Sequence, residues 1–87
     1  MPYQIRAAES VRKDLRRLPA RDRQAVREGV ADLSDDPRPR GAVKLVGSAN
    51  AYRIRIGSYR VIYDVDDRAR TITILRVRHR REAYRSL

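Results

Sequence analysis

Residues 51–65 read AYRIRIGSYRVIYDV, and this stretch predicts the centre of the fold. Its first part, YRIRI, alternates apolar side chains with arginines, as expected for a β-strand with one apolar and one polar face. The Gly-Ser pair that follows is typical of a tight hairpin turn. Residues 59–65 then supply a second strand whose second half is apolar on both faces. The stretch therefore predicts a β-hairpin inside a sheet.

A helix is predicted upstream, in residues 9–19, which read ESVRKDLRRLP. Val11, Leu15 and Leu18 recur at helical spacing and form one apolar stripe. Basic residues cover the rest of this helix, and Pro19 marks the boundary to the next one.

A second helix is predicted in residues 20–33, with the small residues Ala25 and Gly29 beside its apolar positions. Small side chains on an apolar face allow two helices to approach closely, so we expect a helical hairpin. The apolar positions of this helix are Val26, Val30 and Leu33.

The remaining segments complete a small sheet. Residues 3–7 are predicted to form a first strand, residues 44–46 a short strand before a GSAN turn, and residues 71–77 a last strand after a DDRAR turn. Residues 78–87 follow as a basic tail. The order strand, helix, helix and antiparallel meander predicts a single α+β domain over residues 1–87. Its two N-terminal helices pack on one face of a small, mainly antiparallel sheet.

Charge is the strongest compositional signal. The 87 residues include 21 Lys plus Arg and 11 Asp plus Glu, a net charge of +10, and Lys13 and Lys44 are the two lysines. A positive field of this size favours nucleic acid or an acidic protein as partner. Arginine also binds phosphate bidentately without losing its proton. Composition leaves open the alternative of an arginine-rich surface that only confers solubility.

Several classes of protein are disfavoured. The chain has no cysteine, so disulfides and cysteine-ligated zinc cannot stabilise the fold. No apolar run reaches membrane-spanning length, and the sequence MPYQIRAAES lacks the apolar core of a signal peptide. We therefore expect a cytoplasmic protein that has no membrane partner.

The alternation in the hairpin places its arginines on the face opposite the helices. Arg53 and Arg55 share one strand and Arg60 begins the next, so three guanidinium groups are expected to converge. Clustered like charges cost stability and suggest an anion as ligand, although three solvated arginines remain the alternative. In the tail, Arg80 and Tyr84 are four residues apart and would share one face of a helical turn.

His79 is the one histidine of the chain and lies between arginines at the end of a predicted strand, where a structural or a chemical role is open. Tyr52, Tyr59 and Tyr63 are interpreted as core or sheet-edge residues. Phe and Trp are absent, which weakens the case for an aromatic platform that stacks on RNA bases.

Five segments together resemble the RelE family of bacterial and archaeal toxins, within the RelE/ParE superfamily of toxin–antitoxin systems. They are KDLRRLP at 13–19, DP at 36–37, KLVG at 44–47, YRIRIGSYRVIYDV at 52–65 and HRREAY at 79–84. Their order and spacing extend the resemblance over residues 3–84. It implies the fold already inferred, and an endoribonuclease that enters the ribosomal A site and cuts messenger RNA there without a metal or other cofactor.

The resemblance also implies a reaction. The 2′-hydroxyl of the RNA attacks the adjacent phosphate and expels the 5′-oxygen, leaving a 2′,3′-cyclic phosphate. Arg53 and Arg55 occupy hairpin positions that are often lysines in the family. Because an arginine cannot act as the base, we assign both to phosphate binding.

The other family positions lie in the second hairpin strand and in the tail. Arg60 matches the arginine of the family's YR step, and Arg80 and Tyr84 match the arginine and tyrosine of its C-terminal segment. The base is then Tyr84 or His79. Nearby arginines favour the phenolate form of a tyrosine, whereas histidine needs little tuning to act near neutral pH.

Partners are expected on two sides. An acidic antitoxin should wrap the sheet and helices, and the ribosome and its mRNA should be the target. The predicted ribosomal RNA contacts are Arg12, Lys13, Arg16 and Arg17, with Lys44 and Arg81 nearer the site.

Two other functions share this fold or its charge. A ParE-like toxin would inhibit DNA gyrase by protein contact, and a non-catalytic module would bind RNA or the ribosome without cutting. The residues Arg53, Arg55, Arg60, Arg80 and Tyr84 distinguish a ribonuclease from a ParE-like toxin, because inhibition by protein contact does not require them.

Overall fold

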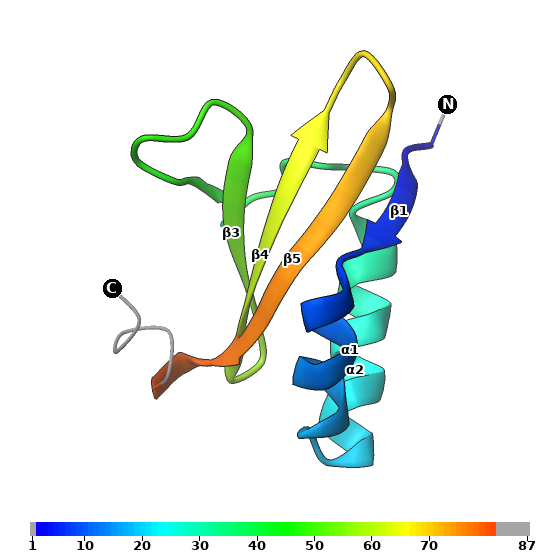
Figure 1. The fold of residues 1–87 in the computed structure, drawn as a ribbon, viewed down its shortest axis with the longest axis vertical. Coiled ribbons are helices and arrows are strands. Elements are labelled where there is room, and N and C mark those ends of the chain that lie inside the picture. The colour runs from blue at the N-terminus through cyan, green and yellow to red at the C-terminus, as the bar shows by residue number, and fades with distance from the viewer. Residues whose placement is uncertain (1, 82–87) are drawn as a thin grey trace.

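The computed structural model describes residues 2–81, so the predicted catalytic residue Tyr84 lies outside the described part of the chain. The five strands form one sheet in the order β1-β5-β4-β3-β2, in which β1 runs parallel to β5 and the other neighbours are antiparallel. Figure 1 shows β1, β5, β4 and β3 side by side in this order. The mainly antiparallel sheet and the two N-terminal helices are as predicted. In chain order the elements are β1 (Gln4–Ala7), α1 (Glu9–Arg16), α2 (Ala20–Asp32), β2 (Val43–Lys44), β3 (Ala51–Ile56), β4 (Tyr59–Asp66) and β5 (Thr71–His79).

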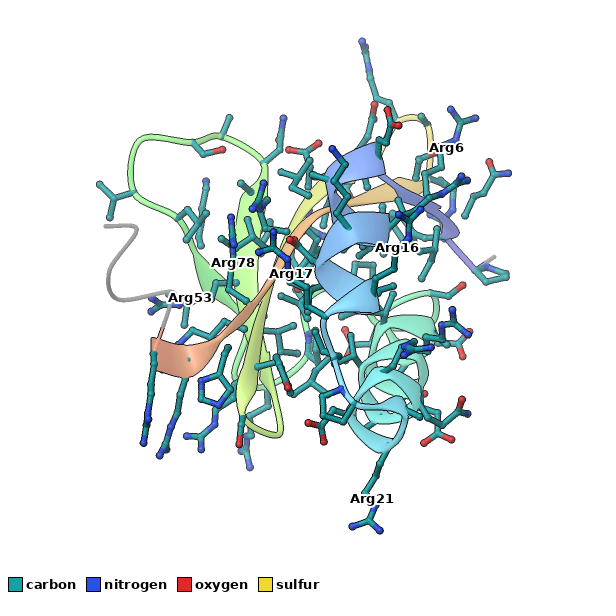
Figure 2. The ribbon with its side chains drawn as sticks, turned by 60° about the horizontal axis from the view of Figure 1, so that its bottom comes forward. Arg6, Arg16, Arg17, Arg21, Arg53 and Arg78 are labelled. Atoms are coloured by element: carbon teal, nitrogen blue, oxygen red, sulfur yellow. The ribbon has the colours of Figure 1, made fainter. Side chains whose placement is uncertain are left out.

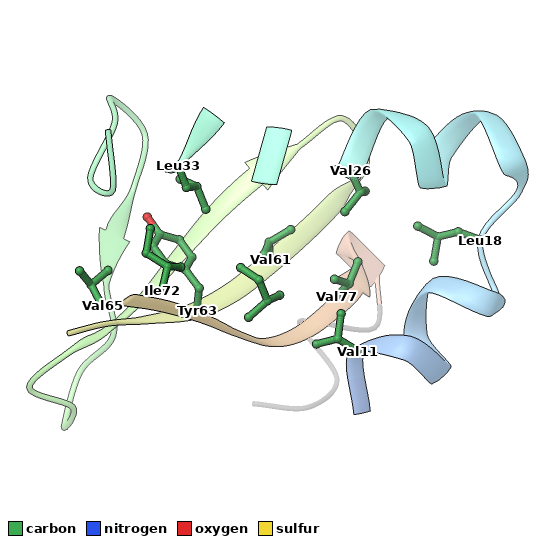
Figure 3. Packing of buried hydrophobic residues seen from close by; sticks show 10 residues of the cluster. Val11, Leu18, Val26, Leu33, Val61, Tyr63, Val65, Ile72 and Val77 are labelled. Carbon is green, nitrogen blue, oxygen red and sulfur yellow. The ribbon is translucent and has the colours of Figure 1, made fainter. Parts of the chain in front are cut away.

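Both helices pack on the same face of the sheet, and the core lies between the two layers (Figure 3). Each fully buried apolar side chain contributes about 1.5–3 kcal/mol relative to an exposed one, so this layer is the main source of stability. Within residues 2–81, neither helix has the length and apolar character needed to cross a membrane. The buried side chains include Val11 from α1, Val26 from α2, Leu33 directly after α2, and Val61, Tyr63 and Ile72 from the sheet.

The hairpin of β3 and β4 has the predicted tight turn at residues 57–58 and the predicted alternation in β3. Tyr52 pairs with Tyr63 and Ile54 pairs with Val61, so the apolar side chains of β3 face the helices. Gly57 has a φ of +61°, a conformation that glycine adopts without steric cost, in the two-residue turn between the strands. The alternation of β3 therefore separates a core face from an arginine face.

Beyond the end of β1, side chains of α1 take the place of a neighbouring strand and hydrogen-bond to the backbone of β5. The Ser10 hydroxyl donates to the Leu75 carbonyl at 2.9 Å, and an Asp14 carboxylate oxygen accepts the Val77 amide at 2.9 Å. Asp14 is 5 % exposed, and the sequence pattern gave no indication of its burial. Because a buried amide without a partner is costly, Asp14 serves as the missing neighbour of this strand edge.

The small residue Gly29 faces the sheet, whereas a close helix–helix contact was expected. A Cβ atom at Gly29 would lie 2.6 Å from the Ile56 Cδ1 atom of β3, and Ala25 is exposed. The glycine therefore brings α2 close to β3. The pairing of the two helices does not depend on it.

Two strands, β2 and β5, end two residues away from the predicted position, whereas the other strand ends lie within one residue of it. β2 covers Val43–Lys44, whereas residues 44–46 were expected, because the Leu45 amide donates to the Ala51 carbonyl and closes the following turn. Val46 is fully exposed in consequence. β5 continues to His79, so the last two strand residues had been assigned wrongly to the tail.

A polar cluster fastens the loop after α2 to the far end of the β4–β5 hairpin. Arg38 Nη2 lies 2.8 Å from Asp67 Oδ2, the Tyr3 hydroxyl donates to Asp67 Oδ1 at 2.6 Å, and Arg38 Nε donates to the Tyr52 hydroxyl at 2.9 Å. The hydrogen bonds from Arg38 and then from Tyr3 hold the pKa of Asp67 below its ordinary value.

Candidate nucleic-acid interface

The sheet face that points away from the helices carries the three hairpin arginines. Arg55 pairs directly with Arg60 across β3 and β4, and Arg53 pairs with Ile62 on the same face. Side chains of directly opposed residues in a sheet start about 5 Å apart at Cβ. The Nε atom of Arg55 also donates to the Gly57 carbonyl at 3.0 Å. The hairpin thus brings the predicted arginines together.

Two arginines of β5 join this face and were missed from the sequence. Arg78 pairs with Arg60, and Arg76 pairs with Ile62. The register shifts directly after Ile62, so Leu75 forms a β-bulge that returns the following arginines to the open face. The break in alternation between Ile74 and Val77 was the available signal. It was overlooked because the strand was expected to end before Arg78.

The arginines form a row across three adjacent strands, from Arg55 through Arg60 to Arg78. Neighbouring strands lie about 4.8 Å apart, so the row spans about 10 Å at the backbone. We call Arg53, Arg55, Arg60 and Arg78 the arginine row. Guanidinium groups at this spacing can contact several oxygens of one phosphodiester, with charge-assisted hydrogen bonds.

The four basic residues of α1 that were predicted to contact RNA divide between two surfaces. Lys13 and Arg17 face β5, where Figure 2 shows Arg17 beside Arg78. They line a polar cavity of about 380 Å³ together with Arg76 and Arg78.

The other two, Arg12 and Arg16, face α2 and not β5. They line a separate cavity of about 310 Å³ around Leu15, with Arg23 and Arg27 of α2 across from them. Four arginines therefore face one another over the helical hairpin, and one of them, Arg23, donates to the Leu18 carbonyl at 3.2 Å.

Lys44 and Arg81 were expected nearer the site. Lys44 pairs with Tyr52 and so lies on the helix side of the sheet, away from the arginine row. Arg81 is exposed just beyond β5. The amide of the preceding Arg80 donates to the Ser58 carbonyl at 2.8 Å, which places the start of the tail beside the β3–β4 turn.

His79 is not brought together with the arginine row. It pairs with Tyr59 on the helix side of the sheet, and the two rings meet edge to face with centroids 5.4 Å apart. The Tyr59 hydroxyl in turn donates to Asp22 of α2 at 2.9 Å. His79 Nδ1 accepts the Arg81 amide at 3.3 Å, so in the neutral ring the proton resides on Nε2.

Comparison with known proteins identifies the family. The family model described as ParE toxin of the type II toxin–antitoxin system parDE matches residues 5–84. Toxin RelG of Mycobacterium tuberculosis is 41% identical over 86 residues, covering 98% of this chain and 99% of the relative.

This chain is a RelE-family toxin of the type II toxin–antitoxin RelE/ParE superfamily.

Solved structures agree with the sequence comparison. The RelBE2 toxin–antitoxin complex of Mycobacterium tuberculosis contains a chain 40% identical to this RelE-family toxin, with a TM-score of 0.81 over 91% of this chain and 99% of that one. The RelE–RelB complex of Pyrococcus horikoshii contains a chain 34% identical, with a TM-score of 0.81 over 92% of this chain and 97% of that one. The RelE-like fold predicted from the sequence is therefore confirmed.

Proposed function

We propose that this toxin is an endoribonuclease that cuts messenger RNA in the ribosomal A site. The observation that supports the proposal is the arginine row, in which Arg60 has Arg55 on one side and Arg78 on the other. Contact with a protein target does not require guanidinium groups aligned on an open sheet face. A phosphodiester that gains negative charge during its reaction does benefit from them.

The reaction proposed is an internal transfer within the RNA. The 2′-oxygen forms a bond to the adjacent phosphorus, and the bond from phosphorus to the 5′-oxygen breaks. A base takes the proton of the 2′-hydroxyl, and an acid gives a proton to the departing 5′-oxygen. The products are a 2′,3′-cyclic phosphate and a 5′-hydroxyl.

The arginines stabilise the negatively charged phosphorane, in which the 2′-oxygen has bound to phosphorus and the 5′-oxygen has not yet left. Arg60, in the middle of the row, is assigned to its non-bridging oxygens, and Arg53 and Arg55 hold the same phosphate from β3. Arg80 approaches from the beginning of the tail, where its amide is bonded to the β3–β4 turn.

Tyr84 is proposed as the base, on the resemblance to the family. His79 is the less suitable candidate, since its ring packs against Tyr59 on the helix side and its Nδ1 already accepts a hydrogen bond. In that neutral tautomer the remaining nitrogen carries a proton and cannot accept another.

Mapping of mRNA 5′ ends after brief induction in cells tests the proposed activity. Cuts inside codons, in frame with translation and absent when ribosomes are stalled upstream, are expected. Intact messages in growth-arrested cells would contradict the proposal.

A ParE-like action on DNA gyrase is the second candidate, because the matching family model is described as a ParE toxin. It predicts intact mRNA, arrested DNA replication and loss of supercoiling by purified gyrase. The same induction experiment therefore separates the two functions.

The proposed partner is an acidic antitoxin with an amphipathic segment. An open apolar cleft of about 440 Å³ lies between β1, α1 and α2, lined by residues that include Ile5, Val26 and Val30. Leu15 and Arg27 line both this cleft and the neighbouring arginine cavity, so apolar and basic surfaces are continuous. An amphipathic helix with acidic flanks matches both features. The related structures named above are complexes of RelE-type toxins with RelB-type antitoxins.

A further inference from the structure

A polar groove of about 380 Å³ runs between α1 and the arginine-bearing face of β5. We call it the α1–β5 groove. It is open to solvent along one side, and each side chain in its wall is polar or charged. The lining residues are Glu9, Ser10, Lys13, Asp14, Arg17, Arg76 and Arg78.

The two walls of this groove are fixed relative to each other. Ser10 and Asp14 of α1 bind the backbone of β5 at Leu75 and Val77, each at 2.9 Å. The same Asp14 carboxylate lies 3.4 Å from Nε of Arg76 and so holds that guanidinium against the wall. Because Asp14 is buried and already engaged, the charge presented to solvent is mainly that of the cations.

The groove continues the arginine row. Arg78 belongs to both, because it pairs with Arg60 across the sheet and also lines the groove. Lys13 and Arg17 then extend the positive surface from β5 onto α1. Figure 2 shows Arg17 of α1 next to Arg78 of β5. A strand of RNA whose scissile phosphate sits at Arg60 would bring a neighbouring phosphate to this groove.

We propose that the α1–β5 groove binds a backbone phosphate of the message next to the scissile one, through Lys13, Arg17 and Arg78. Asp14 acts as a positioning residue that orients Arg76 at the same site. The inference rests on the proposed function, because it takes RNA as the substrate. Each such contact releases counterions from the RNA and makes binding sensitive to salt.

The lining favours RNA over a segment of the antitoxin. An amphipathic protein segment needs an apolar surface to bury its own apolar side chains. The apolar cleft between β1, α1 and α2 provides such a surface. The α1–β5 groove has no apolar side chain among its lining residues. A phosphate group requires no apolar surface for binding.

The test uses full-length toxin and ribosomes programmed with synthetic messages. A message with a 2′-deoxy sugar at the cleavage site lacks the nucleophile, so it reports binding even if the toxin cuts no RNA. The matching ribose message reports cleavage. The groove variant is Lys13→Gln with Arg17→Gln, and the control of equal charge is Arg21→Gln with Arg68→Gln, two exposed arginines outside the groove.

The groove variant should bind the deoxy message at least about tenfold more weakly than the control, and its salt slope should fall by about one for each phosphate that it no longer neutralises. Its cleavage of the ribose message at a toxin concentration below saturation should fall by the same factor as its binding. Melting curves of both variants should match that of the parent protein, which separates weaker binding from weaker folding.

A second change, in the message, completes a double-mutant cycle with the groove variant. It is a neutral methylphosphonate linkage, placed in turn on each side of the scissile phosphate. At one of the two positions it should weaken binding by the parent toxin, and it should have no further effect on the groove variant. Independent, multiplying effects at both positions would overturn the proposal. So would a groove variant that binds the message normally but loses the antitoxin, since the groove would then hold acidic side chains. A parent toxin that binds with this pattern but never cuts would refute only the nuclease function.

Discussion

Arg60 and Arg78 face each other across β4 and β5, on the side of the sheet that points away from both helices. Each pair of opposed arginines costs stability in the free toxin, because like charges directly opposite one another in a sheet repel. An anion bound between the side chains would relieve this repulsion. We therefore expect substitutions in the arginine row to lower the rate of cleavage far more than they lower stability.

Arg60→Ala should abolish most cleavage on programmed ribosomes. Loss of one oriented donor at a phosphorane costs about 3 kcal/mol, or about 100- to 1,000-fold in single-turnover rate. Arg53→Ala and Arg55→Ala should each give a smaller loss. Arg40→Ala, in the exposed loop before β2, is the control that should cleave normally. A folded Arg60→Ala protein with the parent rate would remove Arg60 from the active site.

Tyr84→Phe keeps the aromatic ring and removes the hydroxyl. We expect it to bind ribosomes normally and to cut at least about tenfold more slowly, as is usual for loss of a general base. His79→Ala should reduce the rate less, because the imidazole lies on the other face of the sheet from Arg60. The assignment is reversed if the histidine variant loses activity and the phenylalanine variant keeps it.

The arginine cavity over the helical hairpin should contribute to ribosome binding. Arg12→Glu with Arg16→Glu should weaken ribosome association and flatten its salt dependence, since both side chains lie where ribosomal RNA phosphates are expected. Sedimentation with ribosomes at several salt concentrations measures this. A charge-matched variant, Arg40→Glu with Arg68→Glu, should bind more tightly than the cavity variant. Equal slopes for the two variants would argue against this contact.

The apolar cleft offers a matched pair of substitutions for antitoxin binding. Ala31 and Ala25 are both exposed on α2, but Ala31 lines the cleft and Ala25 does not. Ala31→Glu should weaken binding of the cognate antitoxin at least about tenfold, because it places a charge where an apolar anchor is expected. Ala25→Glu should have little effect. Titration calorimetry with the co-expressed antitoxin provides the comparison, and equal affinities would place the antitoxin elsewhere.

Ionisation of Asp67 should make the free energy of unfolding depend on pH in the acidic range. The pKa of Asp67 is lowered in the folded protein by Arg38 and Tyr3, so the ionised form is favoured by folding. The resulting stabilisation is present above the unfolded value of about 3.9 and is lost as the pH falls through the lower folded value. The parent protein should therefore melt above Asp67→Asn at pH 6, and the difference in Tm should shrink toward about pH 3. A difference that stays constant over this range would show that the contact depends on shape alone.

Local patterns in the sequence were sufficient for most of the elements. The alternation in residues 51–56 separated the arginines from the core side chains. The helical spacing of Val11, Leu15 and Leu18 identified side chains that pack in or against the core, although α1 itself ends at Arg16. These patterns work because the side-chain period of a strand or helix is set by the backbone geometry of that element alone. Arg53, Arg55 and Arg60 could be grouped for the same reason, since a two-residue turn joins their strands.

The rest depended on contacts between distant parts of the chain. Asp14 is buried because the edge of β5, 63 residues further on at Val77, presents an amide that needs a partner. Arg78 enters the arginine row because a β-bulge restores its orientation, and His79 leaves the site because its neighbour across the sheet is Tyr59. No local period encodes which strand edge an α-helix will cover or where a bulge will shift the register. Those choices are made by long-range pairing and by the requirement that buried polar groups be satisfied, and both exist only in the folded protein.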